Sequence, residues 1–241
     1  MTTLFISDLH LDPARPQITQ LFLDFLKTEA RAAEALYILG DFFEIWLGDD
    51  DPDPHHARVI AGVRELANRG VPVYFMHGNR DFLIGERFAR AAGCTLLPDP
   101  HLVNLYGLPT LLMHGDTLCT DDVEYQAFRK MVRDPARQQA FLAKSVEERR
   151  IFMTQARAAT RLHSQTKAEF IMDVNQQAVE HEMKRYGVTR LIHGHTHRPA
   201  VHEFQSGGTG KMRIVLGDWY EQGSMLKVDK TDTRLLSLPL S

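Results

Sequence analysis

The sequence predicts an α/β protein in which two β-sheets are sandwiched between helices. Three observations support this fold class. Short apolar runs rich in β-branched and aromatic residues recur along the chain, segments with helical spacing separate several of them, and the C-terminal part changes to short alternating segments. The chain has 241 residues, 44% of them hydrophobic and 24% charged, which is enough to bury one large core. We therefore expect a single domain over residues 1–241.

The first predicted elements alternate between strands and helices. Apolar residues at helical spacing predict helices over residues 18–28 and 57–68. The predicted strands are bounded by polar or glycine-containing turns and cover residues 4–6, 35–39, 71–76, 108–113 and 190–192.

The C-terminal part has a different pattern. After Trp219, residues 224–229 and 233–238 alternate in hydrophobicity and flank a polar turn, which predicts a terminal hairpin. Together with residues 200–204 and 212–216, this hairpin is expected to form a second, mostly antiparallel sheet.

Residues 123–167 interrupt the alternation, because they contain no strand signal and predict two or three helices. This segment carries ten Lys or Arg residues against four acidic residues, a net charge of +6. The whole chain sums to −3, so the remainder carries −9. We expect the segment to be a helical lid inserted into the domain.

Composition excludes several classes of protein. A net charge of −3 gives no general attraction to nucleic acid or lipid. The chain opens without the pattern of a signal peptide, and no apolar stretch approaches the roughly 20 residues that span a bilayer. Two cysteines, Cys94 and Cys119, cannot build a disulfide framework, so a reducing cytosol is expected. Cys119 is expected to be a small buried residue.

Five short polar patches directly follow predicted strands. A strand-end Asp is often only a helix cap, and a lone His is more often structural than a ligand, so no single patch identifies a site. Parallel strands deliver their carboxyl ends to one sheet edge, so all five are expected to converge there. The patches are Asp8-Leu9-His10, Gly40-Asp41, Gly78-Asn79-Arg80-Asp81, His114 and Gly194-His195-Thr196-His197.

These patches supply the donor atoms of a two-metal site. Carboxylate and amide oxygens mixed with imidazoles suit Mn²⁺, Fe²⁺ or Zn²⁺ better than Ca²⁺ or Mg²⁺. Asp41 is the one obvious bridging residue, which predicts two ions ~3.5–4 Å apart. Two such ions lower the pKa of a shared water and hold phosphate oxygens, so the predicted reaction is hydrolysis of a phosphoryl bond. The expected ligands are Asp8, His10, Asp41, Asn79, His114, His195 and His197.

The ordered pattern of patches resembles the calcineurin-like metallophosphoesterase superfamily and covers residues 8–197. The resemblance implies a four-layer αββα sandwich, here with a helical cap insertion. It also implies two metal sites that share Asp41. One would be held by Asp8, His10, Asp41 and His197, and the other by Asp41, Asn79, His114 and His195.

Arg80 departs from that superfamily, most members of which have His at this position. A guanidinium cannot donate its proton at ordinary pH, but it can hold phosphate oxygens with two hydrogen bonds. We therefore predict that this position stabilises charge and that the leaving group is a phosphate, which needs little protonation.

The third patch, residues 40–46 and the basic insertion together resemble one family, the UDP-2,3-diacylglucosamine pyrophosphatases of lipid A biosynthesis. That resemblance implies two Mn²⁺ ions and cleavage of UDP-2,3-diacylglucosamine to UMP and 2,3-diacylglucosamine 1-phosphate. Another two-metal phosphodiesterase or nucleotide pyrophosphatase is the alternative, and a scaffold that has lost its metals would lack ligands. The catalytic residues would be Asp41, Asn79, Arg80, His114 and His195.

The same resemblance implies a set of substrate contacts. Four of them lie on the insertion, spaced three, four and three residues apart, and so share one helical face: Arg157, Thr160, Ser164 and Lys167. Without the resemblance, this face would be interpreted as a solvated one. The expected contacts are Asn79, Arg80, Asp122, Tyr125, Arg157, Thr160, Ser164, Lys167 and His195.

Apolar residues on the insertion and beside the ligands leave two readings open: an acyl-chain groove, or packing of the cap on the body. They are Phe128, Met131, Phe141, Leu142, Ile151, Phe152 and Met153, with Trp46, Phe82 and Leu83 on the body.

Outward-facing basic residues of the insertion predict salt-sensitive, peripheral attachment of a monomer to an anionic membrane, at the cytoplasmic face of the bacterial inner membrane. They are Arg129, Lys130, Arg133, Arg149 and Arg150. Positive charge concentrated in one insertion argues against a nucleic-acid partner. The acidic run at residues 49–53, with His55 and His56, is expected to be a solvated, mobile loop rather than a further metal site.

Overall fold

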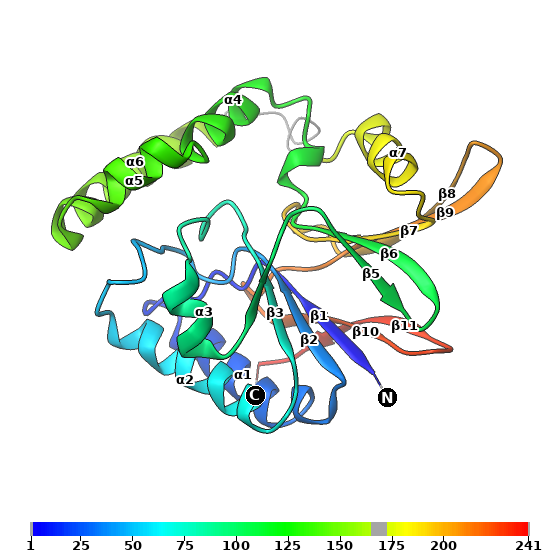
Figure 1. Cartoon of the computed structure of the whole chain (residues 1–241), viewed down its shortest axis with the longest axis horizontal. Helices are drawn as coiled ribbons and strands as arrows, with labels where there is room; N and C mark the ends of the chain where they lie inside the picture. The colour runs from blue at the N-terminus through cyan, green and yellow to red at the C-terminus, as the bar shows by residue number, and fades with distance from the viewer. Residues whose placement is uncertain (1, 165–172, 241) are drawn as a thin grey trace.

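The computed structural model describes residues 2–164 and 173–240, with the side chains of helix α6 described as far as Arg157 (Figure 1). Two sheets face each other. The first has six strands in the order β11-β10-β1-β2-β3-β4, and the second has five in the order β5-β6-β7-β9-β8. The first comprises β1 (Thr3–Ile6), β2 (Ala35–Leu39), β3 (Val73–Met76), β4 (Thr95–Leu97), β10 (Gly223–Val228) and β11 (Thr233–Leu238). The second comprises β5 (His101–Leu105), β6 (Leu108–Met113), β7 (Arg190–His193), β8 (Ala200–Ser206) and β9 (Thr209–Val215).

Helices cover the outer faces of both sheets, which confirms the predicted sandwich. Against the first sheet lie α1 (Pro16–Lys27), α2 (Pro54–Asn68) and α3 (Glu86–Ala92), with a core that includes Ile6, Phe22 and Val63. Against the second lies α7 (Gln176–Arg185), which buries Val179 and Met183. A separate apolar cluster that includes Phe5 and Ile192 fills the space between the sheets.

The helices begin where the sequence supplies start signals. The carboxylate of Asp53 accepts a hydrogen bond from the amide of His55, and Pro54 occupies the first turn of α2. Pro16 does the same for α1, which buries Ile18 and Phe22 on its inner face. These caps place the helix starts two or three residues before the predicted ones.

The terminal hairpin was assigned to the wrong sheet. Strands β10 and β11 pair antiparallel with each other, and β10 then pairs with β1 and extends the first sheet. Of the four strands predicted for the second sheet, β8 and β9 do belong to it and pair antiparallel, while β6, β7 and β9 of that sheet run parallel. Alternation of hydrophobic residues identifies a hairpin, but it does not identify the edge on which the hairpin docks.

Three helices occupy the predicted insertion within the described residues: α4 (Val123–Val132), α5 (Pro135–Leu142) and α6 (Val146–Ser164). We refer to residues 123–164 as the cap. Figure 1 shows the cap helices grouped together above the body. Among the helices of the described part of the chain, none combines the length and apolarity needed to cross a lipid bilayer.

Candidate metal centre

The predicted ligands come from both sheets and meet at one end of the sandwich. Asp8, His10, Asp41 and Asn79 follow parallel strands of the first sheet, whereas His114 and the His195–His197 segment follow parallel strands of the second. The expectation of a single sheet edge was therefore wrong, although the convergence was right. The amide of His195 donates to Asp8 Oδ2 at 2.9 Å, and this bond joins the two sheets at the site.

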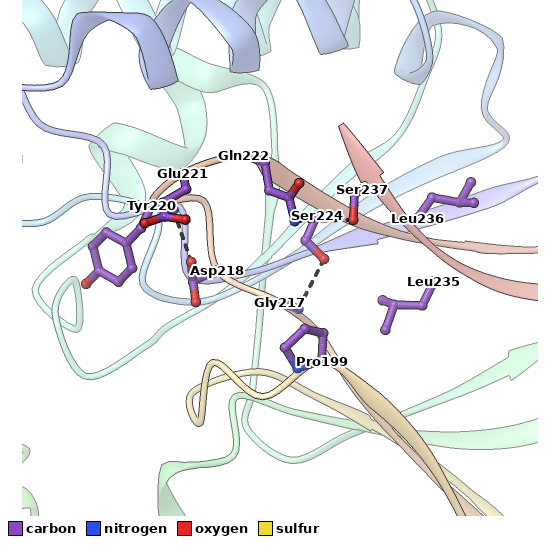
Figure 2. Close-up of a pocket in the computed structure, with 10 residues that line it drawn as sticks. All are labelled: Pro199, Gly217, Asp218, Tyr220, Glu221, Gln222, Ser224, Leu235, Leu236 and Ser237. Carbon is purple, nitrogen blue, oxygen red and sulfur yellow. Dashed lines mark hydrogen bonds between the residues drawn. The ribbon is translucent and has the colours of Figure 1, made fainter. Parts of the chain in front are cut away.

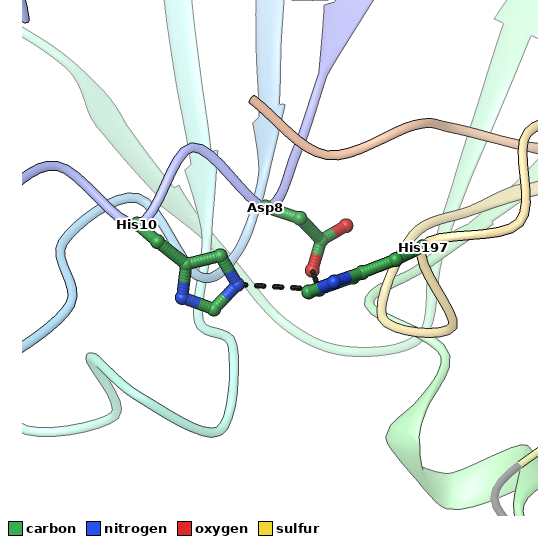
Figure 3. A group of neighbouring side chains, drawn as sticks. All are labelled: Asp8, His10 and His197. Carbon is green, nitrogen blue, oxygen red and sulfur yellow. Dashed lines mark hydrogen bonds and ion pairs between the residues drawn. The ribbon is translucent and has the colours of Figure 1, made fainter. Parts of the chain in front are cut away.

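The first group consists of Asp8, His10 and His197 (Figure 3), whose ligand atoms lie within 4.8 Å of one another. His10 Nε2 lies 3.2 Å from His197 Nε2, which in turn lies 3.4 Å from Asp8 Oδ1. Ser7 and the His195 amide hold Asp8 Oδ2, but Asp8 Oδ1 is buried and has no hydrogen-bond partner among the described residues. Two imidazole nitrogens and an orphaned carboxylate oxygen facing one point fit a cation.

The second group consists of Asp41, His114 and His195, with Asn79 beside them. The Asn79 side-chain oxygen lies 3.0 Å from His114 Nε2 and 2.9 Å from His195 Nδ1. Asp41 places Oδ1 3.8 Å from His114 Nε2 and Oδ2 3.7 Å from His10 Nε2. The carboxylate thus spans the two groups, which is the geometry a bridging ligand requires.

Five of these residues have a strained backbone. Asp8, His10, Asp41, His195 and His197 have φ values of 56°, 48°, 52°, 69° and 56°, in the left-handed region that residues with a Cβ seldom adopt. Such a conformation costs of order 1–3 kcal/mol per residue and persists only where the surroundings enforce it. Its concentration on predicted ligands marks this end of the sandwich as the functional site.

The glycines of the patches allow this close convergence. A Cβ on Gly40, where φ is +90°, would lie 2.6 Å from His114 Nδ1, and one on Gly194 would lie 2.3 Å from Asp8 Oδ2. Neither neighbour can move without displacing a predicted ligand. Glycine is therefore required by the packing of the site itself.

Hydrogen bonds fix which imidazole nitrogen faces the centre. His114 Nδ1 donates to the Leu39 carbonyl at 2.9 Å, and His10 Nδ1 donates to the Glu44 carboxylate at 2.9 Å, so both rings present Nε2. His197 Nδ1 lies 3.7 Å from Asp218 Oδ2. Glu44 and Asp218 were not predicted as site residues. Gly217-Asp218 follows a strand just as Gly40-Asp41 does, and this repetition was the available signal.

The buried charges perturb one another strongly. Burial alone would lower the pKa of His114, but the charges of Asp41, Asp116 and Asp8 raise it to about 9. Burial and the neighbouring charge of His114 lower the pKa of His195 to about 4. Burial alone would raise the pKa of Asp8, yet the nearby imidazoles of His197, His114 and His10 hold it well below its usual value. The carboxylates and imidazoles are thus buried close enough together to change one another's pKa values. A cluster of these groups is also a set of ligands that suits divalent cations.

Asp81, the last residue of the third patch, holds the loops together. It is fully buried, and its two oxygens accept hydrogen bonds from the amides of Gly78 at 2.8 Å and Phe42 at 2.7 Å. Burial and the charge of Asp41 raise its pKa to about 6. Asp81 therefore joins the second patch to the third and does not face the centre.

The predicted substrate contacts occupy different positions. Arg80 and Arg157 both donate to Glu44 Oε1, at 3.4 Å and 2.5 Å. The Tyr125 ring lies 5.9 Å from that of His195, and its hydroxyl donates to Asp116. Asp122 accepts from the Tyr125 amide and caps α4. The side chains of Thr160 and Ser164, and all of Lys167, lie outside the described residues.

Five basic residues of the cap were predicted to face outward, and three of the five assignments were wrong, whereas Arg150 is 47% exposed as predicted. Arg129 pairs with Asp116, Arg133 donates to the Gly78 carbonyl at 2.8 Å, and Arg150 pairs with Asp51. Arg149 is 1% exposed and bonds to Asp50 and to the Leu47 carbonyl. Lys130 is exposed as predicted. The body carries a net negative charge, so it attracts the basic cap residues inward.

The acidic run was also misjudged. Asp49 accepts hydrogen bonds from the amides of Gly85 and Phe88, both at 2.9 Å, so the loop is tied to the start of α3. Asp50 and Asp51 pair with the cap, and Asp53 caps α2. The run is therefore a structured loop between cap and body, not a solvated, mobile one.

Several of the apolar residues singled out in the sequence pack on the body. Trp46 and Leu83 are buried in the core behind the first sheet, and Phe82 and Phe141 pack against that core. Cys119 is buried as expected. Among the described side chains of the cap, the exposed apolar ones are Val123, Phe128, Met131, Leu142, Ile151 and Phe152.

A cavity of about 540 Å³ adjoins the first group (Figure 2). It is lined by Pro199, Gly217, Asp218, Tyr220, Glu221, Gln222, Ser224, Leu235, Leu236 and Ser237, none of which belongs to the cap. Asp218 connects the cavity to His197, and the Tyr220 ring stacks on His10 at 5.3 Å. The cavity thus opens beside the metal centre on the side formed by β10 and β11.

Two facing sheets between helices, with two adjoining Asp/His groups at their strand ends, define the class of metallophosphoesterases. The chain belongs to the calcineurin-like phosphoesterase family, whose profile matches residues 1–199. A solved structure described as a novel archaeal phosphodiesterase shares the fold, with a TM-score of 0.50, 16% identity, and coverage of 99% of this chain and 100% of that one.

Three relatives with similarity over nearly the full length are each named UDP-2,3-diacylglucosamine hydrolase. The protein of Xanthomonas oryzae pv. oryzae (strain PXO99A) is 57% identical, covering 95% of this chain and 96% of its own. That of Xanthomonas axonopodis pv. citri (strain 306) is 56% identical over 100% of both chains. That of Stenotrophomonas maltophilia (strain K279a) is 54% identical over 95% of both. The family resemblance found in the sequence is confirmed.

Proposed function

We propose that the protein hydrolyses the pyrophosphate bond of UDP-2,3-diacylglucosamine, with two Mn²⁺ ions, to UMP and 2,3-diacylglucosamine 1-phosphate. The observation that carries the proposal is 57% identity, over 95% of the chain, with a relative named for hydrolysis of this substrate. The two groups of metal-binding residues support it, because every ligand expected from the sequence lies in or beside one of them.

The residues around the two groups have separate roles in this proposal. Two bound divalent ions would lower the pKa of a shared water and hold phosphate oxygens. Asp41 would join the two sites, while Asn79, His114 and His195 would complete the second. Arg80 would stabilise charge on the transferred phosphoryl group, and a departing phosphate would need no proton from it.

Residues 123–167 would act as the lid of this single domain. Arg157 and Tyr125 lie on its inner side, next to Glu44 and His195. Exposed apolar residues such as Phe128, Met131, Leu142, Ile151 and Phe152 would receive the acyl chains. Each buried methylene would contribute ~0.8 kcal/mol, so even a partly covered chain would raise affinity appreciably.

Peripheral attachment to an anionic membrane, at the cytoplasmic face of the bacterial inner membrane, extends this proposal to a monomeric protein. Within the described residues, the exposed cations of the cap are Lys130, Arg137, Lys144 and Arg150, which stand among the exposed apolar residues. Each would contribute ~1 kcal/mol near an anionic surface. Co-sedimentation with anionic vesicles should fall between low and high salt, and unchanged binding would contradict attachment by charge.

The function is tested by turnover in ¹⁸O-water. The protein, loaded with Mn²⁺, is incubated with UDP-2,3-diacylglucosamine, and the label is located by mass spectrometry. Label in UMP would mean attack on the uridine-side phosphorus, and label in the sugar phosphate would mean attack on the other. Absence of turnover alongside rapid hydrolysis of generic phosphodiesters would favour another two-metal phosphodiesterase. The same assay with Mg²⁺, Fe²⁺ and Zn²⁺ tests the metal.

A further inference from the structure

Glu44 lies at the junction of the metal centre and the cap. Its side chain is 21% exposed and uses its two oxygens for different partners. Oε2 accepts the hydrogen bond from His10 Nδ1 at 2.9 Å. Oε1 accepts from Arg80 at 3.4 Å and from Arg157 at 2.5 Å. One carboxylate therefore contacts a predicted metal ligand, a body arginine and a cap arginine at once.

The two guanidinium groups need such a partner because they repel each other. Both donate to the same oxygen, Glu44 Oε1, so the two cations lie close together, and burial and the charge of Arg80 lower the pKa of Arg157 to about 10. Each uses only one nitrogen on Glu44, and a guanidinium has five N–H donors. Arg157 Nε is buried without a partner among the described residues. Buried N–H donors normally have a hydrogen-bond acceptor, so Arg157 Nε is free to bind the acceptor oxygen of a ligand.

We propose that Glu44 is a positioning residue that couples the anion site to the metal centre. Through Oε2 it turns His10 Nε2 toward the first group, as second-sphere carboxylates do for ligating histidines. Through Oε1 it holds Arg80 and Arg157 together, so that their remaining donors, including Arg157 Nε, face a phosphoryl oxygen. The identity of that anion as part of a nucleotide pyrophosphate rests on the proposed function.

Three variants separate the two roles. Glu44→Gln removes the negative charge that binds His10 through Oε2 and the two arginines through Oε1, and it keeps the shape of the side chain. Asp218→Asn affects only the metal site, because Asp218 faces His197, a predicted metal ligand, and has no ion pair with an arginine among the described residues. Arg157→Ala affects only the anion site, because Arg157 contacts Glu44 through Oε1 and not through the oxygen that binds His10. Two constants are measured: Mn²⁺ affinity by chelator competition, and affinity for inorganic phosphate by calorimetry at saturating Mn²⁺.

Glu44→Gln is expected to weaken Mn²⁺ binding about tenfold, within the 10- to 100-fold range for partners of ligating histidines, and to weaken phosphate binding about fivefold. Asp218→Asn should weaken only Mn²⁺ binding, and Arg157→Ala only phosphate binding. Glu65→Gln, at an exposed residue paired with Arg69, should change neither.

Either binding constant staying within twofold of wild type in Glu44→Gln would overturn the coupling. Both constants are independent of which phosphoester is cleaved. If the wild type fails to hydrolyse UDP-2,3-diacylglucosamine while these shifts occur, the proposed function fails and the role of Glu44 stands.

Discussion

Arg149 anchors the cap to the body. Its removal should lower the free energy of unfolding by more than removal of an exposed arginine does. Its guanidinium donates to the Leu47 carbonyl at 2.6 Å and to Asp50 Oδ1 at 2.8 Å, and its side chain is 1% exposed. In Arg149→Leu the Leu47 carbonyl loses its charged donor and Asp50 loses its counter-ion.

The expected loss can be worked from these contacts. A hydrogen bond from a charged group is worth about 1.5–3 kcal/mol. The Asp50 side chain is 52% exposed, so solvent screens its ion pair with Arg149, and this pair adds at most about 1 kcal/mol. Together they predict a loss of about 3 kcal/mol in the free energy of unfolding.

Urea unfolding followed by circular dichroism measures this loss. Arg69→Leu is the control, because Arg69 and its partner Glu65 are 46% and 54% exposed and pair at 2.7 Å. That variant should lose less than about 1 kcal/mol, as exposed ion pairs do. Equal losses in the two variants, or a loss below about 1 kcal/mol for Arg149→Leu, would refute the assignment of Arg149 as a buried anchor.

Three further predictions concern charge, chemistry and the cap. Burial and the charge of Asp116 raise the pKa of Asp99 to about 6, from 3.8. Its stabilising contribution is therefore fully present below pH 4 and lost as the pH rises through 6. Asp99→Asn should gain up to about 3 kcal/mol at pH 8 and nothing at pH 4, and equal gains in thermal melts at both pH values would count against this. Asn79→Ala and His114→Ala should each abolish hydrolysis with the circular dichroism spectrum retained, whereas Arg80→Ala should mainly lower kcat; unaltered turnover in either of the first two would exclude that residue from the reaction. Phe152→Asp, at a residue 54% exposed, should raise KM for long-chain substrate with unchanged melting temperature, and an equal rise for a short-chain analogue would argue against an acyl contact.

The sequence predicted the candidate metal centre because most of its residues are marked by local features. A strand ends, a glycine permits close packing or an unusual φ, and an Asp or His follows, so Gly40-Asp41 and Gly194-His195 are visible as short patterns. The short elements were missed for the opposite reason. β4 has three residues and α3 has seven, too few for a hydrophobic period to be recognised.

The cap depended on partners that are remote in the chain. Arg149 and Asp50 are 99 residues apart, and Arg157 and Glu44 are 113 residues apart. A basic residue on a polar helix has the same local pattern whether it faces water or a buried acid. Composition thus identified a basic cap, but it could not tell anchoring arginines from free ones.

The sequence alone therefore determined the alternating elements and the types and order of the candidate metal-binding residues, because backbone propensity and donor chemistry are properties of short segments. Tertiary structure decided which sheet receives the hairpin of β10 and β11 and how two sheets share one metal centre. It also decided that Glu44 links His10 to the arginines. These outcomes depend on packing and Coulomb energies between segments far apart in the chain, and no local pattern encodes those energies.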